Sequence, residues 1–125
     1  MHRKINLLVL GHSPGPMKVS AKVRTTKHRV KDWLKACNIL DYDFHNLCPT
    51  HAPTLKLSEI NDKHVLSAIN HDKVIALGNL ASQYLTRKNI DHLKVPHPSM
   101  INRVWNNPEI EPMVINDMRN YIGSV

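Results

Sequence analysis

The sequence has few cysteines, few acidic residues and no long apolar run. Its 125 residues include two cysteines, Cys37 and Cys48, too few for a disulfide framework or a four-cysteine metal site. No apolar stretch approaches the roughly 20 residues that span a bilayer. These deficits disfavour a secreted disulfide scaffold, a classical zinc module and a membrane protein.

Because acidic residues are scarce, the chain is basic. It has 17 Lys and Arg against 10 Asp and Glu, a net charge of +7 with the nine histidines neutral. Such a charge favours an anionic partner. Seven cations are concentrated in one stretch that contains a single acidic residue, Asp32: Lys18, Lys22, Arg24, Lys27, Arg29, Lys31 and Lys35. This stretch either contacts a phosphate backbone or is a solvated helix face.

The rest of the composition is that of one globular domain over residues 1–125. Apolar residues make up 42% and charged residues 22% of the chain. Residues 1–4 lead directly into an apolar run with no small-residue cleavage site, so we expect no signal peptide. We therefore expect a cytoplasmic monomer that does not bind membranes.

Short apolar runs alternate with segments of helical periodicity. Strands are predicted over 4–10, 41–47, 73–77 and 92–95. Helices are predicted from about Thr26, where the apolar spacing continues to Cys37, from N-caps at Ser58 and Asn79, and from Pro108 to Gly123. The alternation predicts an α/β fold, a three-layer sandwich around a mostly parallel sheet of about four strands.

Three predicted loops follow strands and are rich in Pro, His, Asn or Ser. They cover residues 11–16, 46–53 and 96–103. Ligands of parallel α/β sheets bind beyond the carboxyl ends of the strands. The sequence therefore predicts that these loops converge on a binding site.

Four motifs, in chain order, resemble those of the uracil-DNA glycosylase superfamily. The first is Leu-Val-Leu-Gly-His-Ser-Pro-Gly at 8–15, similar to the family's first-strand motif. The second, at 43–53, resembles the asparagine and Cys-Arg-Pro-Pro loop of the bacterial and archaeal iron–sulfur branch. The third is Val-Ile-Ala-Leu-Gly at 74–78, with Ala81, which resembles the family's third strand and turn. The fourth and most specific is His97-Pro98-Ser99, with Arg103 and 107–109 behind it. Together they cover nearly the whole chain, and they imply a minimal glycosylase-like domain.

The resemblance implies cleavage of the N-glycosidic bond of a base flipped out of DNA. His97 would donate a hydrogen bond to the departing base, where negative charge accumulates, unless it is only a buried turn histidine. Asn46 would read the base edge, or else satisfy local backbone. Gly11 would contact the substrate. In the first loop, where the family usually has a carboxylate or amide, the polar residues here are His12 and Ser13, of which His12 would act as a general base and Ser13 would hold a water. Phe44 either stacks on the base or packs in the core.

The same resemblance implies DNA contacts outside the base pocket. Ser99 and Arg103 would bind phosphates near the flipped nucleotide. Met100 is either an apolar wedge that fills the vacated stack or a core residue. Independently of the resemblance, the clustered positive charge predicts that four cations of the basic stretch contact the DNA backbone: Lys18, Lys22, Arg24 and Lys27.

The sequence departs from the family in its first loop and its cysteines. Residues 11–16 contain no Asp, Glu or Asn, and the cysteines of an iron–sulfur cluster are missing, so we expect no cluster and no other cofactor. Four histidines lie near the predicted sheet edge without metal-site spacing, so we expect no metal: His12, His45, His51 and His97.

These features predict a hydrolase that removes uracil or a modified pyrimidine from DNA, in base excision for repair or modification. The alternatives are a non-catalytic DNA-binding protein with the same fold, and other chemistry on a modified base or nucleotide. The short chain suggests a phage or mobile-element source, with function in a bacterial or phage-infected host cell.

Overall fold

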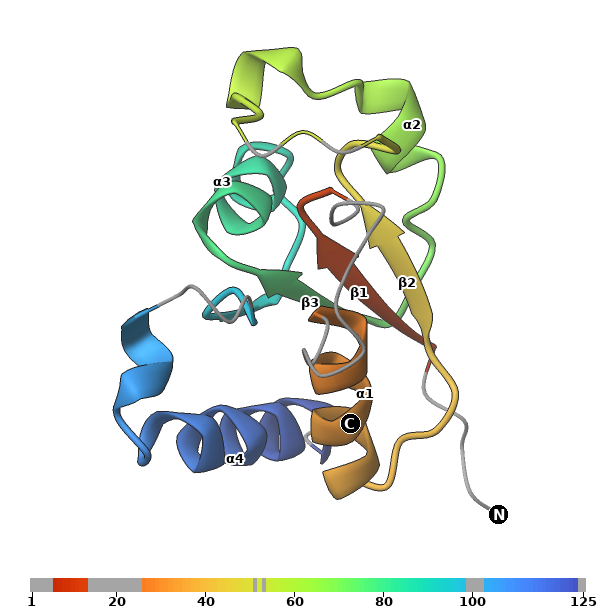
Figure 1. Ribbon diagram of the computed structural model, residues 1–125. Coiled ribbons are helices and arrows are strands. Elements are labelled where there is room, and N and C mark those ends of the chain that lie inside the picture. The colour runs from red at the N-terminus through yellow and green to blue at the C-terminus, as the bar shows by residue number, and fades with distance from the viewer. Residues whose placement is uncertain (1–5, 14–25, 51, 53, 99–102, 124–125) are drawn as a thin grey trace.

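In a computed structural model the chain forms a parallel sheet with helices on both faces (Figure 1). The structure describes residues 6–13, 26–50, 52, 54–98 and 103–123. Strands and helices alternate: β1 (Leu7–Gly11), α1 (Thr26–Ala36), β2 (Asp43–Asn46), α2 (Asp62–Leu66), β3 (Lys73–Leu77), α3 (Asn79–Arg87), β4 (Leu93–Val95) and α4 (Ile110–Gly123). Two 3-10 turns, η1 (Leu57–Glu59) and η2 (Arg103–Asn106), precede α2 and α4. None of the helices in these ranges is long and apolar enough to cross a bilayer.

The sheet has four strands in the order β2-β1-β3-β4, and every neighbouring pair is parallel. The chain leaves β1 to form β2 on one side and then returns to form β3 on the other side. The strand order therefore reverses next to β1, which is the position where open α/β sheets typically bind ligands.

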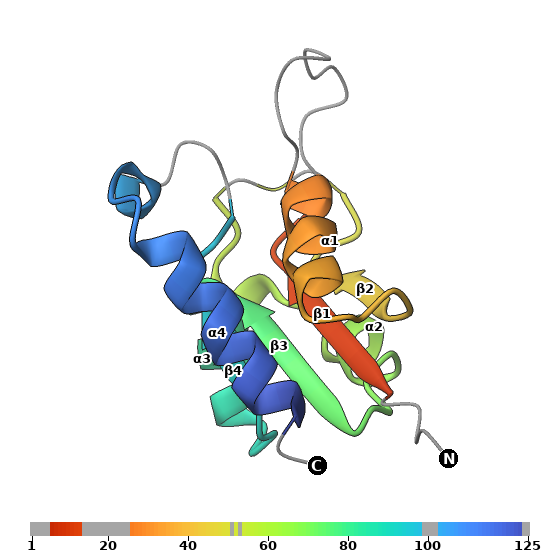
Figure 2. The ribbon, with the colours of Figure 1, turned by 90° about the horizontal axis from the view of Figure 1, so that it is seen from below.

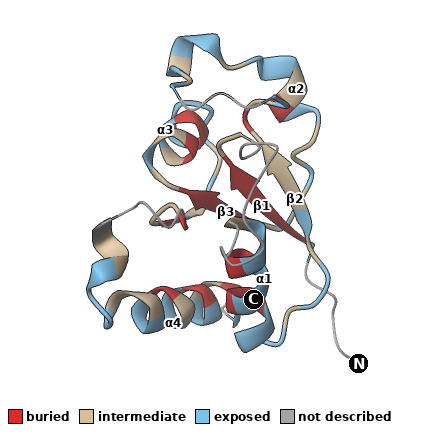
Figure 3. Cartoon of the chain, in the orientation of Figure 1, coloured by how far each residue is buried: buried red, intermediate tan, exposed pale blue. Residues whose placement is uncertain are grey.

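Helices cover both faces, so the central strands are buried (Figure 3). On one face, α1 and α4 pack on alternate strand residues such as Val9, Ile75 and Leu77, and Figure 2 shows these two helices in front of the sheet. On the other face, α3 and Val65 of α2 pack on Leu8 and Leu10 of β1 and on their register partners in β3, Val74 and Ala76. Burial on both faces explains why β1 and β3 are almost continuous apolar runs.

The predicted α/β class, the parallel four-stranded sheet and its layered arrangement are confirmed. Several predicted boundaries are wrong. Ser58 lies in η1, and α2 begins only at Asp62, where the Asn61 side chain accepts a hydrogen bond from the His64 backbone N–H. Cys37 lies one residue beyond α1, and β4 begins at Leu93 rather than at residue 92.

Asn79 is the first residue of α3 rather than its N-cap. The N-cap is Gly78, with a φ of 90° that favours glycine. Its N–H donates to the Val95 carbonyl oxygen at 2.8 Å, so this turn is joined to the end of β4.

Candidate active site at the carboxyl edge of the sheet

The loop after β1 is fixed by hydrogen bonds to the segment after β2. The carbonyl oxygens of Gly11 and His12 accept from the N–H groups of Leu47 and Cys48 at 3.0 and 3.1 Å. The Ser13 hydroxyl oxygen accepts from the Ala52 N–H at 3.2 Å. The loop that carries His12 and Ser13 is therefore held against the second predicted loop.

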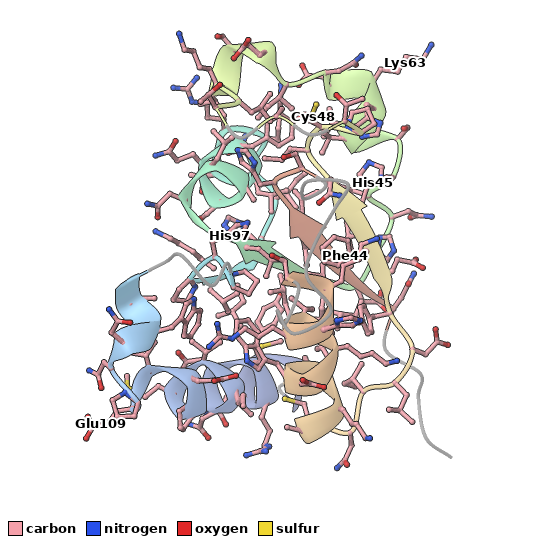
Figure 4. All side chains as sticks on the ribbon, viewed as in Figure 1. Phe44, His45, Cys48, Lys63, His97 and Glu109 are labelled. Carbon is pink, nitrogen blue, oxygen red and sulfur yellow. The ribbon has the colours of Figure 1, made fainter. Side chains whose placement is uncertain are left out.

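His97 lies just beyond β4 and packs against the turn that follows β3. A Cβ atom at Gly78 would lie 3.2 Å from the His97 Cβ, so the glycine allows this close approach. Trp105 of η2 donates a hydrogen bond from its indole Nε1 to the His97 carbonyl oxygen at 2.9 Å. Figure 4 shows His97 near the carboxyl end of β3.

The imidazole rings of His12 and His97 lie edge to face at this edge of the sheet. Their ring centroids are 6.4 Å apart, with the ring planes at 85°. Burial lowers the pKa of His12, and burial together with the proximity of His12 lowers the pKa of His97. Both rings are therefore mainly neutral at pH 7. The Nδ1 of His12 lies 3.2 Å from the Ser13 hydroxyl oxygen, which links this ring to the anchored serine.

Asn46 and Phe44 approach Gly11 from the neighbouring strand. Asn46 is the register partner of Gly11, and a Cβ atom at Gly11 would lie only 2.6 Å from the Asn46 Oδ1. The same Cβ would be 3.1 Å from the Phe44 Cζ. Glycine at this position therefore leaves room for the Asn46 amide and the Phe44 ring.

Phe44 packs against the core, which is one of the two roles predicted for it. It is partly buried against the α1–α4 side of the core. The Lys27 ammonium, at the start of α1, lies 5.4 Å from its ring centroid. No observation bears on its other predicted role, stacking on a base.

A pair of histidines holds the end of β2: His45, which the sequence placed only among the histidines without metal-site spacing, and His64, which no sequence pattern indicated. The His64 Nε2–H donates to the Asn46 carbonyl oxygen at 3.1 Å, and the His45 Nε2–H donates to the His64 carbonyl oxygen at 3.1 Å. Their rings are in contact, with centroids 4.4 Å apart and the ring planes tilted by 34°. This His45–His64 pair joins α2 to the backbone of Asn46.

A second group missed by the sequence analysis supports the segment that carries His97. Arg29 is buried, with its guanidinium carbon 4.3 Å from the Trp105 ring centroid and its Nη2 3.2 Å from a Glu111 carboxylate oxygen. The Trp33 indole donates to the other Glu111 oxygen at 2.7 Å. Arg29 therefore joins α1, α4 and η2, and the expectation that it is part of a phosphate-binding or solvated cationic surface is wrong.

Several predicted DNA-contacting residues lie outside the part of the chain that the structure describes: Lys18, Lys22, Arg24, Ser99 and Met100. Arg103 begins η2. Lys27 is exposed near the carboxyl edge. The predicted contacts of these residues with DNA stay predictions.

Both cysteines are free thiols. The described residues contain no group of three or more His, Cys, Asp or Glu side chains arranged to hold a metal ion.

Comparison with known proteins found no matching family model and no matching curated protein sequence.

Proposed function

We propose that this protein is a DNA glycosylase of the uracil-DNA glycosylase type, which hydrolyses the N-glycosidic bond of a flipped uracil or modified pyrimidine. The observation that carries the proposal is the approach of His12 and His97 at one end of the sheet, with ring centroids 6.4 Å apart. The Asn46 amide beside Gly11 adds a donor and an acceptor at the same edge.

Each group has a role in the proposed reaction. The bond between the sugar C1′ and the base nitrogen breaks, and its electron pair leaves with the base. An imidazole N–H of His97 donates to the base carbonyl oxygen and stabilises the accumulating negative charge. A water oxygen bonds to C1′, and its proton passes to neutral His12 and finally to the departing base. Asn46 pairs with the base edge.

The lowered pKa values fit these roles. A neutral imidazole can accept a proton from water, as the base role of His12 requires. A neutral His97 still carries one N–H for donation. The hydrogen-bonded Ser13 provides a fixed partner for the His12 ring.

A second function, DNA binding without catalysis, is favoured by one observation. Residues 11–16 offer no carboxylate to stabilise a cationic sugar. A protein of this kind would bind the same DNA and leave the glycosidic bond intact.

Single-turnover cleavage of uracil-containing oligonucleotides, single- and double-stranded, separates the two functions. We expect abasic product from the parent protein. His97→Ala should reduce the rate about 10²- to 10³-fold, the usual effect of removing one donor to a developing anion. His71→Ala is the control, because His71 bonds to Asp43 at the opposite end of β2. Salt-sensitive binding without abasic product would contradict catalysis and favour the second function.

A further inference from the structure

An open groove of about 430 Å³ lies outside the candidate active site, along α3 and the edge strand β4. The helix α3 contacts the strand β4 at this side of the sheet. Six residues line the groove, and all of them are polar or cationic: Asn79, Ser82, Gln83, Thr86, Arg87 and Lys94.

The chemistry of this lining favours an anion. Arg87 and Lys94 supply two positive charges, and no lining residue is acidic. Asn79, Gln83 and Thr86 add neutral hydrogen-bonding groups. The fourth neutral group, the Ser82 hydroxyl, lies 2.8 Å from the His92 Nε2. Cations with neutral donors and without aromatic side chains suit phosphate groups better than the faces of bases.

The position of the groove connects it to the candidate active site. Asn79 lines one end of the groove and directly follows Gly78, the residue that packs against His97. A nucleic-acid strand with one nucleotide beside His97 can therefore continue along α3 within the same molecule. An open groove also suits a strand that enters and leaves, whereas a small ligand is usually enclosed.

We propose that this α3–β4 groove binds the phosphodiester backbone of the DNA strand on one side of the reacting nucleotide, through Arg87 and Lys94. The inference rests on the proposed function for the identity of the strand. It adds a contact surface on the opposite face of the sheet from α1, the helix that carries the described residues of the cationic stretch.

The test removes the two charges and measures DNA binding without any damaged base. Arg87→Gln combined with Lys94→Gln is compared with Lys56→Gln combined with Lys63→Gln, which lowers the net charge equally at exposed positions outside the groove. Undamaged single- and double-stranded oligonucleotides are titrated over a series of salt concentrations. Thermal unfolding establishes that both double variants are folded.

We expect the groove variant to bind about tenfold more weakly at low salt. The slope of log K against log salt should fall by about two, one for each lost phosphate contact. Replacing one phosphate at a time by a neutral methylphosphonate should locate the contact. At a phosphate that the groove binds, the replacement should weaken binding to the parent and should not weaken binding to the groove variant further.

Two results would overturn the inference. The first is a groove variant with the affinity and salt slope of the control variant. The second is saturable binding of inorganic phosphate that the groove mutations abolish while oligonucleotide affinity stays at the control level, which assigns the groove to a small anion. Cleavage of uracil-containing DNA is measured separately. If the parent cleaves DNA and the groove variant binds DNA like the control variant, only the groove inference is contradicted. If binding depends on the groove and no cleavage occurs, only the proposed glycosylase activity is contradicted.

Discussion

At the scale of single residues, the candidate chemistry depends on two imidazoles that are neutral near pH 7. Burial lowers the pKa of both His12 and His97 from the value of about 6.5 for a free imidazole. Each ring therefore takes up its proton only in more acidic solution. A neutral His12 accepts a proton, whereas a charged one cannot.

This state of His12 and His97 predicts the pH dependence of turnover. Under single-turnover conditions with saturating DNA, the rate should be constant around pH 7.5. It should fall as the pH drops below 6.5, because protonation of His12 removes the base. An acid limb with its midpoint above 6.5 would contradict the lowered pKa values. His92→Gln, which changes a histidine bonded to Ile90 and Ser82, should leave the profile unchanged.

Gly11 determines where the Asn46 amide lies. Gly11→Ala would bring a methyl group within 2.6 Å of the Asn46 Oδ1, so the amide has to move. We expect the rate of uracil removal to fall about tenfold, which corresponds to the free energy of about one hydrogen bond. Overpacking should also lower the free energy of unfolding by about 1–3 kcal/mol.

The matched control for Gly11→Ala is Gly123→Ala. A Cβ atom at Gly123 meets nothing within 4 Å, so this variant should retain activity. Equal rates for Gly11→Ala and the parent would show that the position of the Asn46 amide does not matter for the reaction.

At the scale of elements, β2 is an edge strand whose far end is held by α2. The His64 side chain of α2 donates to the backbone of Asn46, and His45 donates back to α2. The orientation of Asn46 therefore depends on a helix of five residues as well as on its strand. Short helices are stabilised mainly by tertiary contacts, so this pair fixes both partners.

Two substitutions at His64 separate a hydrogen-bonding role from packing. His64→Leu removes the donor to the Asn46 carbonyl oxygen, and we expect a loss of about 1 kcal/mol in stability together with weaker discrimination between uracil and other pyrimidines. His64→Gln keeps an N–H donor and should restore part of the discrimination. Competition assays with oligonucleotides carrying different pyrimidines measure this effect.

The control for the His64 variants is His71→Leu. This change breaks the 2.7 Å contact with Asp43 at the other end of the same strand. It should lower stability and leave base discrimination unchanged. Equal discrimination by the parent and by His64→Leu would remove His64 from the positioning of Asn46.

At the scale of the whole molecule, the sequence predicted the layers and the edge where the loops meet. The continuous apolar runs at 73–77 and around Val9 indicated strands buried on both faces, and both are. The periodicity of Val30, Trp33 and Leu34 indicated the buried face of α1, which the structure confirms. These features could be predicted because each depends on local spacing along the chain.

Contacts between distant residues could not be predicted in this way. Arg29 looked like one more cation of the basic stretch, but it is buried with Glu111 and Trp105, which lie about 80 residues further along the chain. Likewise, no local pattern indicated that His64 would bond to Asn46. Such partners depend on how helices dock on the sheet, which composition and periodicity do not determine.

Release of the free base is the most direct test of the central claim, that His97 and His12 act together to break an N-glycosidic bond. Uracil-containing DNA is incubated with an equimolar amount of protein, and free uracil is quantified by mass spectrometry together with the abasic sites. We expect equal amounts of the two products from the parent and little of either from His97→Ala. DNA that stays intact while bound to the folded parent protein would contradict the claim.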